Sequence, residues 1–102
     1  MSEFAEFMTT PVTWWDVDAY GNKTADPHTA RGLVEHDTHL VIDVHGREVT
    51  CGTRVYLPAG TGVQVGQHMA SQADPEARRV VKIERYTAGT VDLPGHEVVH
   101  LL

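Results

Sequence analysis

The sequence predicts a mostly β fold, namely a small, partly closed antiparallel β-barrel with long loops and little helix. Apolar and polar side chains alternate with period two along several extended segments, which is typical of strands with one packed and one solvated face. Residues 58–62, Pro-Ala-Gly-Thr-Gly, form a sharp corner of the kind that a short sheet needs to wrap around its own core. Helix-like spacing occurs only in residues 2–8, a segment too short to be a stable helix alone.

Seven strands are expected along the chain. They comprise residues 12–17, 30–36, 38–44, 47–57, a brief 63–65, 79–85 and 97–102. In residues 38–44, Leu40, Ile42 and Val44 share one face. Residues 47–57 place mostly apolar side chains (Val49, Cys51, Val55, Leu57) on one face and polar ones (Glu48, Thr50, Arg54, Tyr56) on the other. Residues 18–29, 67–77 and 87–95 are expected to be turns and loops.

Five residues are predicted to shape the turns. Pro58 has no N–H for a strand ladder, and glycine adopts positive φ at little cost. The predicted turn residues are Gly21, Pro58, Gly60, Gly62 and Gly66.

Length and composition indicate one domain. We assign residues 1–10 to an N-terminal arm and residues 11–102 to a single barrel. The net charge of −6 disfavours a protein that grips nucleic-acid phosphates, and no apolar run is long enough for a membrane-spanning helix. The start of the chain lacks the features of a secretory signal, and the single cysteine, Cys51, fits a reducing compartment.

The residues give no sign of catalysis, a cofactor or a metal. Cys51 lies on an apolar strand face, as a buried small hydrophobe does. His36 and His39 are expected on opposite faces of a strand. His96 and His100 share a face but are separated by about 13 Å, too far to ligate one ion. No acid/base pair or phosphate-binding glycine motif is recognisable, so we expect no enzyme.

The adjacent residues Trp14 and Trp15 are expected to point to opposite sides of their strand, one into the core. The outward ring is either a contact anchor for a partner or packs under the N-terminal arm.

The order of short motifs in this chain resembles that of the head-to-tail stopper (head closure) proteins of long-tailed bacteriophages, especially those of actinobacterial hosts. The resemblance runs from Pro11 to the C-terminus. The motifs, in order, are Asp18-Ala19-Tyr20-Gly21-Asn22, a Gly-Arg-Glu-Val turn, Val55-Tyr56-Leu57-Pro58-Ala59-Gly60, Val63-x-Val65-Gly66 and Asp92-Leu93-Pro94-Gly95-His96-x-Val98.

The resemblance implies a non-enzymatic virion protein without cofactors, made in the host cytoplasm and located at the neck, the head–tail interface. Such proteins form a ring beneath the portal and its adaptor, retain packaged DNA and provide the surface on which the tail docks. Expected partners are further copies of the chain (six or twelve in the ring), adaptor and portal proteins, and tail terminator or tail tube proteins. Genomic DNA passes through without sequence-specific binding, and no membrane is involved.

Position in the chain suggests which residues serve these contacts. Candidates for a channel-facing hairpin are Asp43, His45, Gly46, Arg47 and Glu48, with Arg47 pairing to a neighbouring subunit and residues 67–76 as a second channel candidate. Candidates for subunit or ring interfaces are Trp14, Trp15, Tyr20, Tyr56, Pro94 and His96, together with the loops 23–29 and 87–95. The alternatives are another neck ring protein such as a tail terminator, a small barrel that binds a peptide or oligonucleotide, and, weakest, a histidine metalloenzyme.

Overall fold

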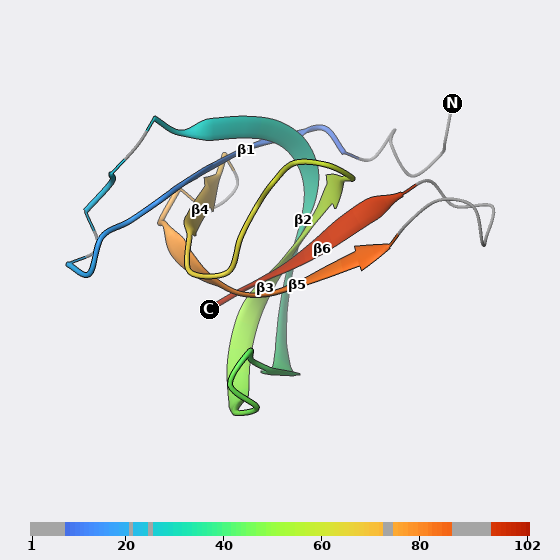
Figure 1. Ribbon diagram of the computed structural model, residues 1–102. Coiled ribbons are helices and arrows are strands. Elements are labelled where there is room, and N and C mark those ends of the chain that lie inside the picture. Colours follow the sequence, from blue (N-terminus) through green and yellow to red (C-terminus); the bar gives the residue numbers. More distant parts are fainter. Residues whose placement is uncertain (1–7, 21, 25, 73–74, 87–94) are drawn as a thin grey trace.

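The computed structural model describes residues 8–20, 22–24, 26–72, 75–86 and 95–102. These residues form six strands and no helix: β1 (Thr10–Trp15), β2 (His28–Ile42), β3 (Glu48–Pro58), β4 (His68–Ser71), β5 (Arg78–Tyr86) and β6 (His96–Leu101). All neighbouring strands are antiparallel and follow the order β1-β2-β3-β6-β5-β4 (Figure 1). Because β1 pairs with both β2 and β4, the barrel is closed. The mostly β prediction is confirmed. No helix of the described residues is long and apolar enough to cross a membrane.

The barrel core comes from alternate residues of the strands, as the period-two pattern predicts. On β3, Cys51, Val55 and Leu57 are buried, while Arg54 and Tyr56 are partly exposed on the outer side. The main core cluster joins Val55 and Leu57 to side chains from β1, β4, β5, β6 and the loop before β4: Val12, Trp14, Val63, Met69, Val80, Val99 and Leu101. The burial of Cys51 confirms the prediction that it serves as a small core residue.

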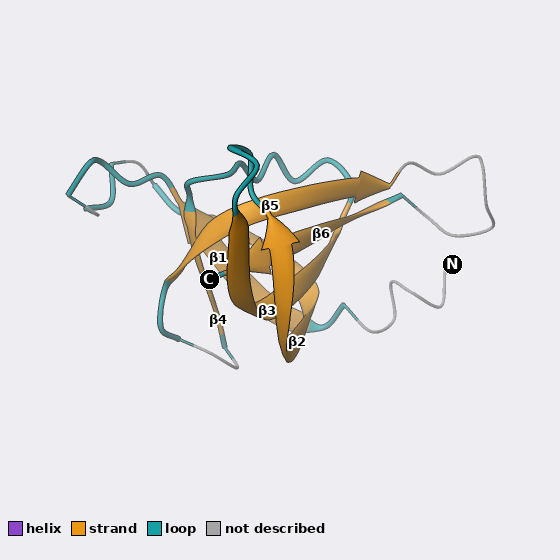
Figure 2. Ribbon diagram, turned by 90° about the horizontal axis from the view of Figure 1, so that it is seen from below, coloured by secondary structure: helices purple, strands orange, loops and turns teal. Residues whose placement is uncertain are grey.

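Strands β2 and β3 extend beyond the barrel as a two-stranded hairpin arm, residues 38–52. Strand β1 pairs with β2 only as far as Gly32, and β6 pairs with β3 only from Thr53 onward. Residues 38–42 therefore pair only with β3 among the described strands. The arm points downward in Figure 1 and lies in front of the barrel in Figure 2. Along the inner side of the arm, Val41 and Cys51 pack on Val81 of β5.

Three strand predictions were wrong. Residues 30–36 and 38–42 belong to one strand, β2, because a register shift between His36 and His39 absorbs the irregularity, and residues 43–44 lie in the turn after it. Residues 63–65 form no strand; Val63 is instead buried in the core from a loop. Part of the predicted loop 67–77 is β4, which pairs with β1 and closes the barrel. Only Met69 is buried in this four-residue strand, so it shows no alternation.

The predicted turn glycines are confirmed where the structure describes them. Gly60, Gly62 and Gly66 have φ angles of 84°, 81° and 94°, a region that side chains rarely adopt. Pro58 is the last residue of β3, consistent with its inability to continue the ladder. Gly21 lies outside the described residues.

Candidate functional site

The tip of the hairpin arm is organised by Asp43. Its Oδ1 accepts hydrogen bonds from the backbone N–H groups of His45 and Arg47, both at 2.9 Å, and its Oδ2 lies 3.5 Å from Arg47 Nε. The bond from the Arg47 N–H is the main reason that the pKa of Asp43 lies below its ordinary value. Gly46 supplies the positive φ of 79° that the turn requires. Asp43 is thus a turn-building residue that stays ionised.

The five channel candidates all lie together at this tip. His45, Arg47 and Glu48 are exposed, and the Arg47 side chain keeps 75% of its surface accessible. Arg47 pairs with Asp43 of its own chain, so its pairing with a neighbouring subunit remains a prediction. The second channel candidate, residues 67–76, contains β4 and contributes part of the closed barrel wall.

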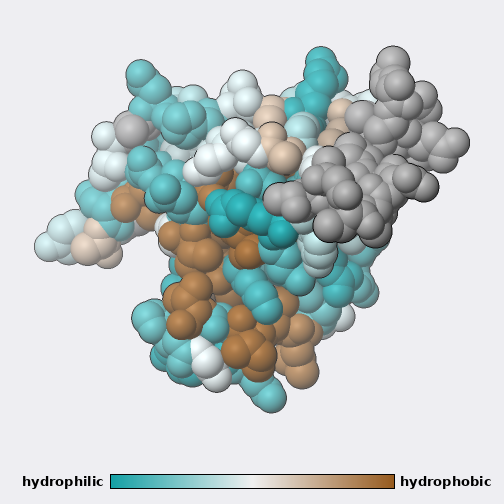
Figure 3. All heavy atoms as spheres, turned by 45° about the vertical axis from the view of Figure 1, so that its right-hand side comes forward, coloured by the Kyte–Doolittle hydropathy of each residue, from teal (hydrophilic) through white to brown (hydrophobic). Residues whose placement is uncertain are grey.

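Exposed aliphatic side chains line the space between the arm and the barrel. Leu40, Ile42 and Val44 are 65%, 48% and 65% exposed, whereas Val41 between them is buried. The alternation predicted for this strand is therefore present, with three apolar side chains on the solvent side. Figure 3 shows hydrophobic side chains gathered over the lower centre of the molecule, at the height of the arm.

Two adjoining hollows lie beside the arm, with volumes of about 690 and 210 Å³, and both are bounded by Val44 and Val65. We call them together the basic hollow. Ile42 and Ile83 contribute to its apolar floor. Its walls carry four basic side chains, namely Arg47, Arg79, Lys82 and Arg85, and its acidic lining residue is Asp43.

Arg85 and Glu97 hold one wall of the basic hollow in place. Arg85 Nε donates to Glu97 Oε2 at 3.0 Å, and Arg85 Nη2 donates to the Val63 carbonyl oxygen at 2.7 Å. The other carboxylate oxygen of Glu97 accepts a hydrogen bond from the Thr61 hydroxyl. Because Glu97 is only 3% exposed, this network fastens the loop before β4 onto β5 and β6.

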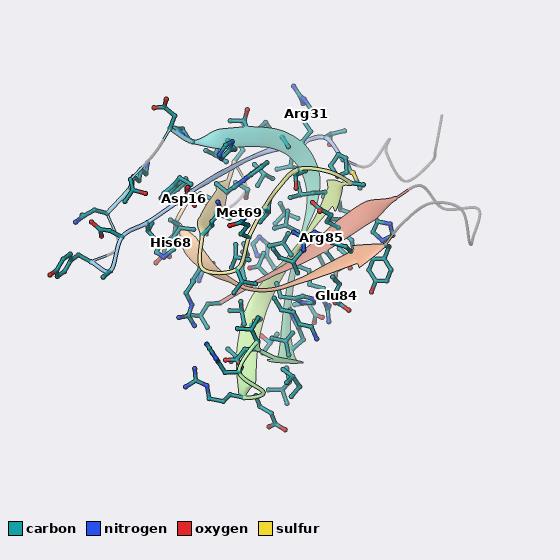
Figure 4. The ribbon with its side chains drawn as sticks, in the orientation of Figure 1. Asp16, Arg31, His68, Met69, Glu84 and Arg85 are labelled. Carbon is teal, nitrogen blue, oxygen red and sulfur yellow. The ribbon has the colours of Figure 1, made fainter. Side chains whose placement is uncertain are left out.

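A second polar array joins the base of the arm to the barrel. His100 Nε2 donates to Glu84 Oε1 at 2.5 Å, and the other His100 nitrogen, Nδ1, lies 2.8 Å from His39 Nε2 (Glu84 is labelled on β5 in Figure 4). Burial lowers the pKa of His100 despite the opposing effect of Glu84. The hydrogen bond from His100 lowers the pKa of Glu84.

Acidification is expected to destabilise the protein through this array. The pKa of His100 is lower in the folded state than in the unfolded chain, where it has its ordinary value of 6.5. Below pH 6.5 the unfolded chain therefore binds a proton that the folded protein does not. The stabilisation is therefore complete above about pH 6.5 and decreases as the pH falls through the lowered pKa. Glu84 adds a further loss below its ordinary pKa of 4.5.

Urea midpoints measured from pH 7.5 to pH 5 test this expectation. The midpoint should fall across the range, and His100→Gln should flatten that dependence because the side chain no longer titrates. His45→Gln, at the exposed arm tip, is the matched control and should keep the wild-type slope. An unchanged slope in His100→Gln would contradict the assignment.

An outer groove of about 520 Å³ crosses β2, β3, β6 and β5. The rings of Tyr86 and His96 stack there with centroids 4.8 Å apart, and Tyr56 lies in the same groove. Arg54 Nη1 lies 2.5 Å from Asp37 and 3.2 Å from Glu35, and the bond to Asp37 is the main cause of its raised pKa. The interface candidates Tyr56 and His96 thus share one surface.

Both tryptophans are buried, so neither is the exposed contact anchor that was one of the two expectations for the outward ring. Trp14 is 2% exposed and stacks on His28, while Trp15 is 8% exposed. Trp15 ends β1, and the following loop folds back so that Lys23 Nζ lies 4.2 Å above the centre of a Trp15 ring. Within the described residues, Lys23 thus covers the second ring.

Tyr20 is the most exposed large hydrophobic residue of the described chain, at 89%. It stands at the end of a rigid turn, in which the N–H groups of Tyr20 and Asn22 donate to Asp18 Oδ1 at 2.8 and 3.0 Å. Tyr20 therefore remains an interface candidate. Pro94 and most of the candidate loop 87–95 lie outside the described residues.

The histidines form no metal site within the described part of the chain, where no group of three or more His, Cys, Asp or Glu side chains is placed to hold an ion. His96 contacts Tyr86, whereas His100 contacts Glu84 and His39. Burial raises the pKa of the Cys51 thiol, which disfavours the thiolate that a nucleophile requires. No family model, curated protein or solved structure was found to match this chain.

Proposed function

We propose that this chain is a structural virion protein of a long-tailed bacteriophage, forming a ring at the head–tail interface. In this role it retains packaged DNA beneath the portal and adaptor and provides the docking surface for the tail. The proposal rests on the order of motifs described above, which resembles that of head-to-tail stopper proteins.

The observation that carries the proposal is the hairpin arm on an otherwise closed barrel. A ring subunit needs a rigid body with separate surfaces for its neighbours, because a closed cyclic assembly uses heterologous contacts. The barrel supplies such a body, and the arm extends residues 38–52 beyond it. An arm of this kind can reach into a central channel while the barrels form the ring wall.

The charge of the arm tip suits a channel through which DNA passes without being held. Asp43 and Glu48 are acidic, and the single cation among the channel candidates, Arg47, lies against Asp43. Each phosphate neutralised by a Lys or Arg would add salt-dependent affinity and hinder the release of DNA. An acidic tip avoids that attraction.

The direct test is genetic. The Trp14 codon of the phage genome that encodes the chain is replaced by a stop codon, and a lysate from a non-suppressing host is imaged by electron microscopy. Finished tails beside heads that have lost their DNA would support the proposal. Complete infectious particles would overturn it, and tails of abnormal length would favour the alternative of a tail terminator.

Reversing the charge at Glu48 tests the role of the arm tip. Glu48→Lys is expected to reduce infectious particles by at least about tenfold, because the new cation lies where DNA must pass. Plaque titre and DNA retention in purified particles measure the effect. Glu35→Lys, an exposed reversal on β2 outside the arm and the channel candidates, is the matched control, since Arg54 keeps its ion pair with Asp37. Wild-type titre and DNA retention in Glu48→Lys would count against a channel-facing tip.

The outer groove favours a second candidate, a small barrel that binds a peptide or oligonucleotide. Tyr56, the Tyr86–His96 stack and the cation Lys82 share that groove, and aromatic rings beside basic residues are typical of single-strand binding surfaces. Glu84 in the groove and the acids beside Arg54 oppose an anionic ligand. Fluorescence anisotropy with a labelled oligonucleotide tests it. Binding that weakens in Tyr86→Ala would support this candidate.

A further inference from the structure

The basic hollow is lined mainly by positively charged side chains, although the chain as a whole is negatively charged. The protein has a net charge of −6, yet four of its eight basic residues line this one region beside a single acidic lining residue. The carboxylate of that residue, Asp43, is occupied by the arm turn and by Arg47. The hollow therefore offers cations around an apolar floor, which fits a partner segment that carries acids beside an aromatic or aliphatic tip.

The chain itself carries such a segment between β1 and β2. Residues 16–20, which we call the Tyr20 loop, contain Asp16 and Asp18 and end at the 89% exposed Tyr20. Figure 1 shows that this loop projects to the left, whereas the hairpin arm projects downward. The two features thus occupy different surfaces of one molecule.

The Tyr20 loop is held in one shape before any partner binds. Besides the two bonds to its side chain, Asp18 donates its N–H to the Asn22 carbonyl oxygen at 2.9 Å, and Thr24 N–H donates to the Asp16 carbonyl oxygen at 3.1 Å. The bonds that the Asp18 carboxylate accepts from the N–H groups of Asn22 and Tyr20 lower its pKa, so its negative charge persists at neutral pH. A preorganised loop loses little conformational entropy on docking.

We propose that the Tyr20 loop of one copy docks in the basic hollow of the next copy. The Tyr20 ring lies against Val44 and Val65, and the carboxylate of Asp18 faces Lys82 and Arg79. Asp16 instead accepts a hydrogen bond from Gln67 Nε2 of its own barrel at 2.8 Å. A volume of about 690 Å³ for the larger hollow is ample for one aromatic side chain and its neighbours. The contact joins two different surfaces, so repetition generates a chain of subunits that closes into a ring at the correct rotation. Closure into a ring rests on the proposed function, whereas the pairwise contact does not.

Other occupants fit the hollow less well. DNA phosphate would meet the cations, but the apolar floor formed by residues such as Ile42 and Ile83 offers nothing to a phosphate. The N-terminal segment also combines acids with aromatic residues (Glu3, Phe4, Glu6, Phe7). The Tyr20 loop is favoured over that segment because its exposed ring is already fixed on a hydrogen-bonded turn.

Disulfide cross-linking tests the contact directly. A chain carrying both Tyr20→Cys and Val65→Cys is oxidised over a range of concentrations up to the solubility limit. The native Cys51 is 0% exposed and does not compete. We expect a ladder of covalent multimers from the double variant, and a single covalent heterodimer when the two single variants are mixed. The matched control pairs Val65→Cys with Tyr86→Cys, an exposed tyrosine on the outer groove.

Three results would overturn the proposal: no ladder at any concentration, an equal ladder from the Tyr86→Cys control, or a ladder unaffected by charge reversal in the hollow. Lys82→Glu is expected to lower the ladder yield about tenfold at low salt. Deleting residues 2–7 should leave the ladder intact, and its loss would assign the hollow to the N-terminal segment instead. Salt-dependent binding of duplex DNA that Lys82→Glu abolishes would assign it to nucleic acid.

Failure of this contact and failure of the proposed function give different results. If the double variant forms a ladder but the stop-codon phage still forms complete particles, the contact between copies is supported and the role at the neck is contradicted. If the stop-codon lysate contains separate heads and tails but the double variant forms no ladder, the role at the neck is supported and the contact between copies is contradicted.

Discussion

Leu57→Ala is expected to lower the free energy of unfolding by about 2–5 kcal/mol, the range typical of a buried leucine reduced to alanine. Leu57 is 0% exposed and belongs to the main core cluster, together with Val12 of β1, Val80 of β5 and Val99 of β6. Truncation leaves a cavity where strands from several parts of the closed barrel meet, and the closed wall limits how far they can collapse into it. Urea unfolding followed by tryptophan fluorescence measures the loss.

The matched control is Leu40→Ala on the hairpin arm. Leu40 is 65% exposed, so its truncation removes little buried surface and should change the unfolding free energy by less than about 0.5 kcal/mol. The slope of the unfolding free energy with urea should be the same in both variants, because both unfold the same surface. Equal losses in the two variants would mean that the arm, not the barrel, determines stability.

The sequence predicts the barrel wherever alternation is long enough to identify a face. On β3 the buried positions Cys51, Val55 and Leu57 follow the period-two pattern, and the strand is found almost at its predicted bounds. Strand β4 cannot be predicted in this way, because only one of its four side chains is buried and no alternation is visible in the sequence. The alternation of Val63 and Val65 resembles that of a strand, but the positive φ angles of the glycines on either side place these residues in a loop. Val63 is nevertheless buried.

The candidate surfaces depend on contacts between distant residues. Arg47, Arg79 and Lys82 look scattered along the sequence, and only the position of the arm beside β5 brings them together. His39 and His100 are 61 residues apart and meet at the irregularity in β2, which no strand pattern reveals. Trp15 is buried because a loop returns over it, an effect of tertiary structure that simple alternation leaves out.

Gly32→Ala is expected to destabilise the protein by about 1–3 kcal/mol, although it adds only one methyl group. A Cβ at Gly32 would lie 2.7 Å from the Tyr56 carbonyl oxygen and 2.8 Å from Leu57 Cδ2. The first of these atoms is backbone of the paired strand β3 and cannot rotate away, so β2 and β3 must separate locally. For a domain of this size, such a loss lowers the melting temperature by roughly 4–8 °C per kcal/mol, which thermal unfolding resolves.

Gly52→Ala isolates the steric cause of that loss. Gly52 lies on β3 in the hairpin arm, a Cβ there meets nothing within 4 Å, and its φ is not in the positive region. The same substitution should therefore be neutral, or stabilise by up to about 1 kcal/mol through the reduced entropy of the unfolded chain. If both variants lost stability equally, the close approach of β2 and β3 at Gly32 would not be the cause. A loss of stability in Gly32→Ala with no loss in Gly52→Ala would show that the close approach of β2 and β3 at Gly32 requires glycine, whereas the arm at Gly52 does not.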